Sequence, residues 1–220
     1  MIHELIKKYS KIDPDGIKVV FTHSSFINEN LANNTLLSNE RLEYLGDSVI
    51  SFIVSNYLYS KYSDLPEGDL SKIRSEIVNQ NSLSDKSKSL NLGELLILGK
   101  GEEKNNGRNK NSNLCNLFEA LFGYFSIKIG ISETSELLIN LFKDKIDFLI
   151  AERAYFDPKS MLQEKLQDDN LDLPIYKSQK NTDGKFKVSL YIKNSLYAEA
   201  YGKRKIDAEK EAAKIALNKL

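Results

Sequence analysis

The chain has 220 residues, of which 41% are apolar and 28% charged, and its formal net charge is zero. This composition can support a packed core and excludes a membrane span, because no apolar run reaches the roughly 20 residues that such a helix needs. The length predicts one domain of roughly 150 residues and a smaller one, while a single cysteine and an N-terminus without an apolar signal segment predict a cytoplasmic protein with no membrane partner.

Residues 1 to about 155 have the apolar spacing of helices. From residue 42 to residue 58 apolar side chains recur at steps of three and four and fill most remaining sides, so we predict a helix that is buried nearly all round. Another helix starts near Pro66, and residues 99–113 are a polar loop rich in Gly and Asn. Two further apolar helices are expected within 114–130 and 135–154.

The pattern changes after residue 156. Asp157 and Pro158 are a helix cap and a first helical residue, and residues 157–167 have the spacing of a short helix. Residues 185–193 alternate between apolar and polar side chains, which predicts a half-buried strand. A hairpin turn at 181–185, a strand at 195–202 and a helix from 205 complete a helix, three strands and a helix. This tail holds 13 basic against 10 acidic residues, a net of +3, which leaves −3 for the rest.

The stretch "NERLEYLGDSV" at 39–49 sets three acids on one side of the predicted helix: Glu40, Glu43 and Asp47. A second helix has Glu119, with Asn116 three residues earlier on the same side. Oxygen ligands from two crossing helices suit Mg²⁺ or Mn²⁺. A solvated acidic helix face is the alternative. The surrounding apolar residues, and Gly46 as a point of close helix contact, count for a metal site as strongly as the spacing counts for a solvated face, so both interpretations stay open.

"NERLEYLGDSV" resembles the signature of the ribonuclease III family, and "FTHSSFINE" (21–29), "PEGDLSKIR" (66–74) and "LCNLFEALFG" (114–123) follow in the order of that family. The tail resembles a double-stranded-RNA-binding domain through "DPKSMLQEKLQ" and "AYGKRKIDAEKEAAKIAL". The resemblance implies a mainly α fold: an all-α endonuclease domain at 1–154, followed by an α-β-β-β-α RNA-binding domain at 157–220.

The resemblance also implies an activity. It predicts a homodimeric, Mg²⁺-dependent endoribonuclease, with Mn²⁺ as a substitute and no small-molecule cofactor. Such an enzyme cuts double-stranded RNA during RNA processing, ribosomal RNA included, and leaves 5′-phosphates and short 3′ overhangs. By position, Glu43, Asp47, Asn116 and Glu119 match metal ligands, and Asp47 and Glu119 match catalytic residues. Two further acids match the valley between subunits: Glu40 and Glu67.

Asn116 departs from the family, which has an aspartate at this position. An amide oxygen can coordinate Mg²⁺ but contributes no charge, so we expect weaker metal binding. Three accounts stay open: a native enzyme that tolerates Asn, a natural member with reduced or lost cutting, and an engineered change that traps substrate. The rival function is a duplex-RNA-binding protein that has kept this scaffold without cutting.

Duplex RNA is recognised by shape, phosphates and 2′-hydroxyls over roughly 16 base pairs, which requires separated contact points. In the tail we expect these from the first helix, the hairpin turn and the start of the last helix: Lys159, Gln163, Glu164, Gly184, Lys185, Lys203, Arg204 and Lys205. Ile206 and Asp207 stand where the module is commonly basic, so binding is expected to be weakened.

Two reactive side chains are given structural roles. Cys115 has no histidine near it in sequence and is interpreted as a small buried hydrophobe. His23, in "FTHSS", is interpreted as making a local structural hydrogen bond rather than acting as a base.

Overall fold

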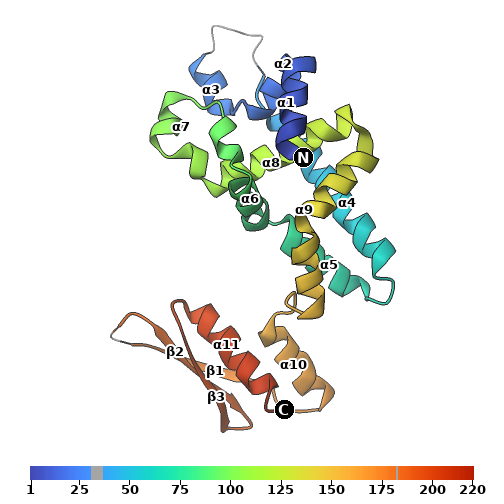
Figure 1. Ribbon diagram of the computed structural model, residues 1–220. Helices are drawn as coiled ribbons and strands as arrows, with labels where there is room; N and C mark the ends of the chain where they lie inside the picture. Colours follow the sequence, from blue (N-terminus) through green and yellow to red (C-terminus); the bar gives the residue numbers. More distant parts are fainter. Residues whose placement is uncertain (31–36, 182) are drawn as a thin grey trace. The chain divides into compact units, whose positions relative to one another are not determined.

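The structure is a computed structural model that describes residues 1–30, 37–181 and 183–220. Contacts divide the chain into two compact units, Met1–Glu152 and Arg153–Leu220 (Figure 1). The first unit contains helices, and the second combines two helices with a small antiparallel sheet, so the predicted mainly α fold is confirmed. Within the residues described, no helix is both long enough and apolar enough to span a bilayer.

The first unit consists of helices joined by short connections. In chain order they are α1 (Ile2–Ile12), α2 (Pro14–Phe21), α3 (Ser24–Glu29), α4 (Glu40–Lys61), α5 (Glu67–Val78), α6 (Gln80–Ser89), η1 (Leu92–Leu95), α7 (Lys100–Lys104), η2 (Gly107–Asn109), α8 (Asn111–Lys128) and α9 (Gly130–Ala151). The two apolar helices predicted within 114–130 and 135–154 are confirmed as α8 and α9.

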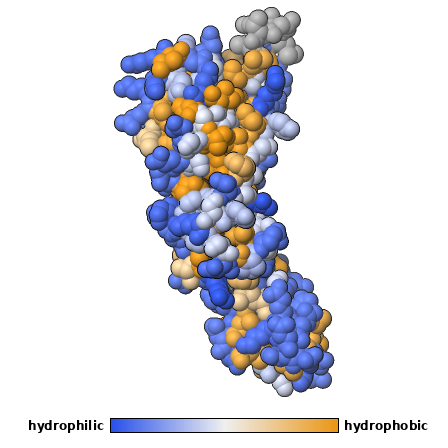
Figure 2. Space-filling model, turned by 90° about the vertical axis from the view of Figure 1, so that its right-hand side faces the viewer, coloured by the Kyte–Doolittle hydropathy of each residue, from blue (hydrophilic) through white to orange (hydrophobic). Residues whose placement is uncertain are grey.

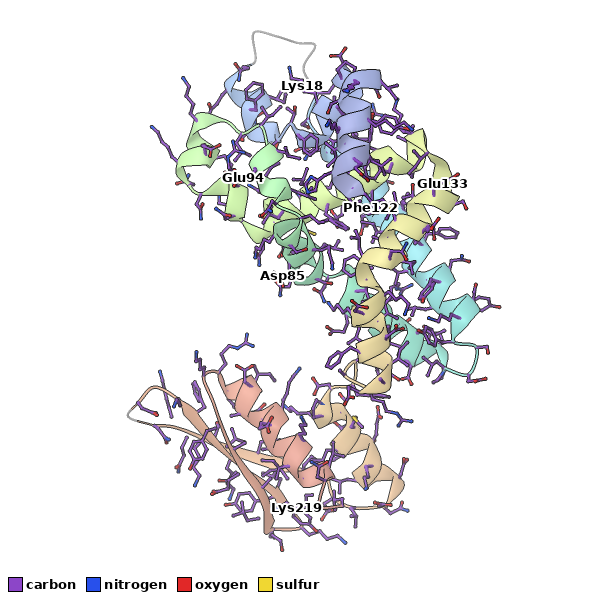
Figure 3. The ribbon with its side chains drawn as sticks, viewed as in Figure 1. Lys18, Asp85, Glu94, Phe122, Glu133 and Lys219 are labelled. Carbon is purple, nitrogen blue, oxygen red and sulfur yellow. The ribbon has the colours of Figure 1, made fainter. Side chains whose placement is uncertain are left out.

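Helix α8 forms the centre of this unit, and α4, α6 and α9 pack against it. Its side chains at Phe118, Phe122 and Phe125 are fully buried, and Phe122 lies in the interior in Figure 3. Phe118 stacks on Phe122 with ring centroids 4.7 Å apart. Burying such rings contributes about 2 to 3 kcal/mol each, so α8 holds its neighbours in place.

Two predictions for this unit need correction. Helix α4 is not buried nearly all round: its inner face is, but Tyr44, Phe52 and Tyr59 are exposed. Figure 2 shows apolar side chains on the surface of this unit. The polar loop at 99–113 contains α7, η2 and the start of α8. The helix predicted to start near Pro66 is confirmed as α5, and it ends at Val78 because Asn79 has an extended backbone and caps α6 through its side chain.

The second unit contains α10 (Pro158–Asp168), β1 (Ile175–Lys180), β2 (Phe186–Ile192), β3 (Ser195–Gly202) and α11 (Lys205–Leu217). The sheet is antiparallel in the order β1-β2-β3, with α11 packed on β2 and β3 and α10 packed on α11. Alternation placed β2 correctly, since Val188, Leu190 and Ile192 are buried. The predicted hairpin turn at 181–185 includes Thr182, which lies outside the described residues.

Helix α11 buries small side chains, which lets it approach the sheet closely. Ala208, Ala212, Ala213 and Ala216 are inaccessible and share a core with Leu162 and Leu166 of α10. Ile206, near the start of the same helix, is 42% exposed. The side chain of Asp157 accepts a hydrogen bond from the backbone N–H of Lys159, which confirms the predicted helix cap.

Candidate active site and nucleic-acid interface

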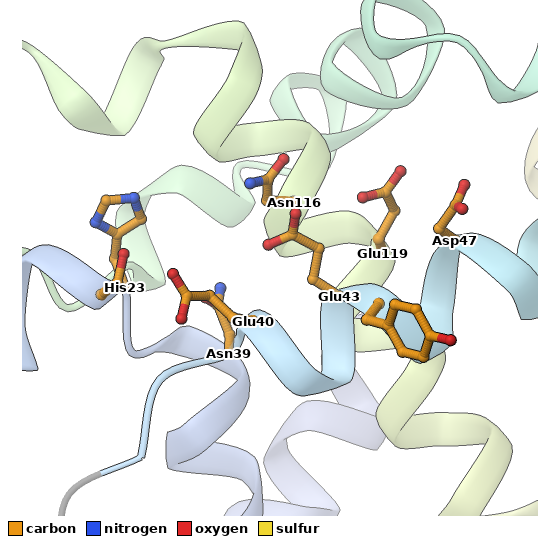
Figure 4. A pocket seen from close by; sticks show the side chains of 9 residues that line it. His23, Asn39, Glu40, Glu43, Asp47, Asn116 and Glu119 are labelled. Atoms are coloured by element: carbon orange, nitrogen blue, oxygen red, sulfur yellow. The ribbon is translucent and has the colours of Figure 1, made fainter.

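Four of the five acids that the sequence singled out lie around one pocket of about 400 Å³ in the first unit (Figure 4). Glu40, Glu43 and Asp47 reach it from α4, and Asn116 and Glu119 reach it from α8. The remaining lining residues are His23, Ser24, Asn39 and Tyr44. The two predicted helix faces therefore meet at one site.

Two glycines allow α4 and α8 to cross closely enough for this. A Cβ on Gly46 would lie 1.8 Å from the backbone oxygen of Glu119, and a Cβ on Gly123 would lie 2.3 Å from that of Leu42. Real Cβ atoms do not approach backbone so closely, so any larger residue would force the helices apart. The expectation that Gly46 marks a close helix contact is confirmed, and this contact places Asp47 beside Glu119.

The pocket holds negative charge that the protein does not neutralise itself. Burial raises the pKa of Glu119 to about 7, the charges of Asp47 and Glu43 add to the rise, and a hydrogen bond from Cys115 opposes it. Burial also raises the pKa of Glu43, as do Glu40 and Asp47, against a hydrogen bond from Asn116. Among the ion pairs of the described residues, none includes these acids. Such uncompensated acids destabilise the fold and are typical of functional sites.

The donors that line the pocket fit a hard divalent cation. Carboxylates of Glu43, Asp47 and Glu119 and the amide oxygen of Asn116 are ligands that Mg²⁺ prefers. In the part of the chain that the structure describes, no three His, Cys, Asp or Glu side chains converge into a ready-made metal-binding group. Figure 4 shows the carboxylates spread along the pocket rather than meeting at one point.

Glu67 does not line this pocket. It is the first residue of α5, where its carboxylate accepts a hydrogen bond from the hydroxyl of Ser71. Cys115 is buried, its pKa is raised to about 12 by that burial, and its thiol contacts Glu119 Oε1 at 3.5 Å. The thiol is therefore protonated at neutral pH, as the interpretation of Cys115 as a small buried residue expects.

Sequence reasoning missed the part of the pocket formed by Asn39 and the segment before α3. Asn39 is buried, with its side-chain amide donating to Val20 O at 3.3 Å and its backbone N–H donating to Thr22 O at 2.9 Å. His23 caps α3 through its ring, which confirms a local hydrogen bond. Nothing in the spacing of 20–23 and 39 signals that these segments are adjacent.

In the second unit, basic residues predicted to contact RNA form ion pairs with acids of the same unit. Lys159 Nζ lies 2.7 Å from the carboxylate of Glu209, and Lys205 Nζ lies 3.8 Å from it. Arg204 donates two hydrogen bonds to Asp207, of 2.9 and 2.7 Å. Asp207, which sequence analysis singled out as replacing a basic residue, therefore also engages its neighbour.

The sheet register brings the hairpin turn next to the start of α11. Phe186 pairs with Gly202, so Lys185 and Lys203 lie just beyond the same end of the β2–β3 ladder. Gly184 has a φ of +81°, which a turn glycine adopts without strain. Gln163 and Glu164 are exposed on α10, and Lys185, Lys203 and Lys205 are exposed. Among the described residues Lys203 has no ion pair, whereas Lys185 Nζ lies 3.8 Å from the carboxylate of Asp183.

Comparison with known protein families supports both halves of this description. Residues 13–145 match the family model described as Ribonuclease-III-like. Residues 158–220 match the model of a double-stranded RNA binding motif.

Individual relatives agree. The chain is 39% identical to a protein named Ribonuclease 3 from Borreliella burgdorferi, over 92% of this chain and 84% of that protein. It is 38% identical to a Ribonuclease 3 from Natranaerobius thermophilus, over 95% of this chain and 91% of that protein. A solved nuclease domain of ribonuclease III from Campylobacter jejuni, whose description refers to a region involved in dimer formation, matches with a TM-score of 0.55 and 34% identity, covering 60% of this chain and 87% of that one.

Proposed function

The chain belongs to the ribonuclease III family, and we propose that it is a double-strand-specific endoribonuclease whose cutting depends on Mg²⁺. The observation that carries the proposal is the pocket between α4 and α8. There four carboxylates and the amide of Asn116 line the same cavity, in a chain whose tail matches a double-stranded RNA binding motif. The same oxygen ligands accommodate Mn²⁺ as a substitute.

In this proposal residues 1–154 are the endonuclease domain and residues 157–220 the RNA-binding domain. Glu43, Asp47, Asn116 and Glu119 would hold the cation, which when bound would supply an activated water and stabilise charge on the phosphate oxygens. Asp47 and Glu119 orient that chemistry, while burial of Glu119 keeps bulk water from competing for its carboxylate. Glu40 and Glu67 are further acids of the valley. The products have 5′-phosphates and short 3′ overhangs.

The second unit would hold the duplex by shape and by phosphate contacts. Lys159, Gln163 and Glu164 on α10 contact sugars, Gly184 and Lys185 contact the second minor groove, and the start of α11 contacts phosphates. The contacts at the start of α11 come from Lys203, Arg204 and Lys205. The internal ion pairs at Arg204 and Lys159 support an affinity below that of an unopposed basic surface.

We also propose a homodimer formed through the first unit. Tyr44 is 80% exposed at the edge of a groove with apolar lining from Val19, Leu42 and Ile127. An exposed aromatic ring beside an apolar groove suits an interface between two copies. Light scattering of the purified chain tests this, since a monomer mass at micromolar concentration would contradict the dimer.

One observation favours a second candidate function, a duplex-RNA-binding protein that does not cut. Asn116 contributes no negative charge at a position where the family has an acid. The retained acids of the pocket count against this candidate, because holding the partly buried Glu43 and Glu119 beside other carboxylates costs stability that a lost site has no reason to retain.

The deciding experiment compares the chain with Asn116→Asp on the same long RNA duplex in Mg²⁺ and in Ca²⁺. The proposal expects the unaltered chain to cut in Mg²⁺ and to bind without cutting in Ca²⁺. It expects Asn116→Asp to increase the rate mainly at limiting Mg²⁺, because a fourth negative charge tightens cation binding. An unaltered chain that never cuts, beside a variant that cuts rapidly, would instead support the binding protein.

A further inference from the structure

His23 differs in kind from the other side chains of the acid pocket. The rest of the lining consists of carboxylates, amides and hydroxyls: Ser24, Asn39, Glu40, Glu43, Tyr44, Asp47, Asn116 and Glu119. Figure 4 shows the imidazole at one end of the row of acids, near Asn116 and Glu40. A polyanion that enters a pocket of acids needs hydrogen-bond donors there; the four carboxylates supply none when ionised, and not every amide is free to donate. The amide of Asn39, for example, already donates to Val20 O.

The hydrogen bonds of the imidazole determine which nitrogen bears the hydrogen. The backbone N–H of Ser25 points at Nδ1 from 3.2 Å, and since a backbone N–H can only donate, Nδ1 must accept. The hydroxyl of Ser25 lies 2.8 Å from Nδ1 and itself accepts from the backbone N–H of Gly99 at 3.0 Å. That hydroxyl hydrogen is therefore directed at Nδ1 as well. The ring hydrogen is left on Nε2.

Backbone hydrogen bonds also fix the position of the imidazole relative to the acids. The N–H of His23 donates to Ile97 O at 3.0 Å, and the N–H of Asn39 donates to Thr22 O at 2.9 Å. Asn39 directly precedes α4, so the segment that carries His23 is attached to the start of the helix that carries Glu40 and Glu43. The Nε2–H group is thus held in place before any ligand arrives, which lowers the entropic cost of using it.

We propose that the Nε2–H of His23 donates a hydrogen bond to a non-bridging phosphate oxygen of the RNA strand that occupies the acid pocket. The inference deepens the proposed function and rests on it. Nδ1 and Ser25 hold the ring, and Nε2 contacts the substrate. His23 is accordingly a substrate-positioning donor and not a base, because its only free lone pair is already used at Nδ1.

Two substitutions test the roles of Nδ1 and Nε2 separately. Asn at position 23 has a short side-chain oxygen that can accept from Ser25 N–H, and it is a favourable helix cap, but it has nothing at the place of Nε2. Gln reaches towards the place of Nε2 with an amide donor. We expect His23→Asn to keep the melting temperature, to bind a short RNA duplex about tenfold more weakly in Ca²⁺, and to raise KM in Mg²⁺ more than it lowers kcat. We expect His23→Gln to recover much of the loss.

His3→Asn is the matched control, because His3 is exposed on α1 and does not line the pocket. If His23→Asn folds normally and binds RNA as the unaltered chain does, the proposal is wrong. It is also wrong if the Asn and Gln variants have equal melting temperatures and lose the same amount of RNA affinity. A chain that binds in Ca²⁺ but never cuts in Mg²⁺ would contradict the proposed activity alone, since the binding comparison still tests His23.

The tautomer gives a test without RNA. The chain has two histidines, so the His3→Asn protein labelled with ¹⁵N shows a single imidazole in its NMR spectrum. We expect the hydrogen on Nε2 and none on Nδ1. A neutral ring with its hydrogen on Nδ1 would overturn the inference whatever the enzymatic result.

Discussion

In the first unit, Glu43, Asp47 and Glu119 surround one pocket, and no ion pair of the described residues includes any of them. In the second unit, most of the cations expected to meet RNA are paired within the unit, as Lys159 is with Glu209 and Arg204 with Asp207. One unit thus keeps like charges together without compensation, and the other neutralises the charges that a polyanion would use. The first arrangement lowers the stability of the fold, and the second lowers the affinity for RNA.

The difference separates stability from function. Partial burial and the charges of neighbouring acids raise the pKa values of Glu43 and Glu119, and holding these carboxylates ionised destabilises the fold. The divalent cation that we propose would therefore stabilise the fold when it binds. Exposed ion pairs contribute little to stability, typically less than about 1 kcal/mol. They nevertheless compete directly with phosphates for the same cations. The first unit should therefore respond strongly to substitution of one acid, and the second should respond mildly and in the direction of tighter binding.

The largest effect is expected from Glu119→Gln. Loss of an outer partner of a metal ligand typically costs about 10- to 100-fold in affinity or activity, so loss of a ligand itself should slow cleavage at least 100-fold. The folded metal-free protein should become more stable at pH 8. Because the pKa of Glu119 is raised to about 7, ionisation destabilises the fold as pH rises from the ordinary carboxyl range through that value, and Gln removes this penalty.

Single-turnover cleavage of an RNA duplex and thermal unfolding at pH 8 measure the two effects of Glu119→Gln. Glu133→Gln is the control, because Glu133 is exposed in the first turn of α9 and outside the acid pocket. A variant that cuts normally, or one that loses both activity and stability, would contradict the view that Glu119 is held for function at the expense of stability.

The second effect concerns the helix crossing on which the acid pocket depends. Gly46→Ala places a methyl group 1.8 Å from the backbone oxygen of Glu119, so α4 and α8 must separate. We expect a loss of roughly 3 kcal/mol or more of unfolding free energy in the first unit, measured by urea titration, together with loss of cleavage. Gly68→Ala is the matched control, because nothing lies within 4 Å of its Cβ. Equal stability of both variants would contradict the close crossing.

These residues also show what the sequence could predict. Helical spacing alone predicts that Glu40, Glu43 and Asp47 lie on one face of their helix. Gly46, beside Asp47, indicated a close contact with another helix. The partner helix was found because Asn116 and Glu119 repeat the pattern of polar residues on an apolar helix. The exposure of Tyr44, Phe52 and Tyr59 was missed, because the composition of an apolar helix does not reveal which of its sides the rest of the unit covers.

In the tail, alternation identified β2, but no local pattern shows which acid pairs with which base. Lys159 and Glu209 are 50 residues apart in sequence and 2.7 Å apart in space. The placement of His23 was likewise beyond a sequence argument, since it depends on backbone hydrogen bonds from His23 to Ile97 and from Asn39 to Thr22. Periodicity predicts which face a side chain occupies, and the tertiary fold decides what that face meets.

A smaller effect is expected in the second unit, where a substitution should strengthen RNA binding. Asp207→Lys removes the carboxylate that engages Arg204 and adds a positive charge at the start of α11. Duplex RNA affinity in Ca²⁺ should rise roughly threefold to tenfold, and its dependence on salt should steepen, because more phosphate contacts release more counterions. Asp172→Lys, an exposed site outside the predicted contacts, makes the same change in net charge. Equal gains from both variants would assign the effect to net charge and not to the Arg204 ion pair.

The smallest effect is expected at Asp13, which is also in the first unit. Its substitution should lower the stability of the fold, whereas Glu119→Gln should raise it. Asp13 accepts hydrogen bonds from Lys128 at 2.7 Å, Tyr124 at 2.8 Å and the backbone N–H of Gly16 at 3.2 Å, and the bond from Lys128 contributes most to lowering its pKa. A carboxyl with a lowered pKa stabilises the fold at pH values above its ordinary pKa of 3.8, and this contribution is lost as pH falls through the lower folded-state pKa.

Asp13→Asn should therefore lower the melting temperature at pH 7, where Glu119→Gln raises it, and the difference from the unaltered chain should shrink below pH 3.8. Asp15→Asn, at an exposed position two residues away, is the control, and a decrease that persists unchanged into acid would show that the charge of Asp13 is not its source.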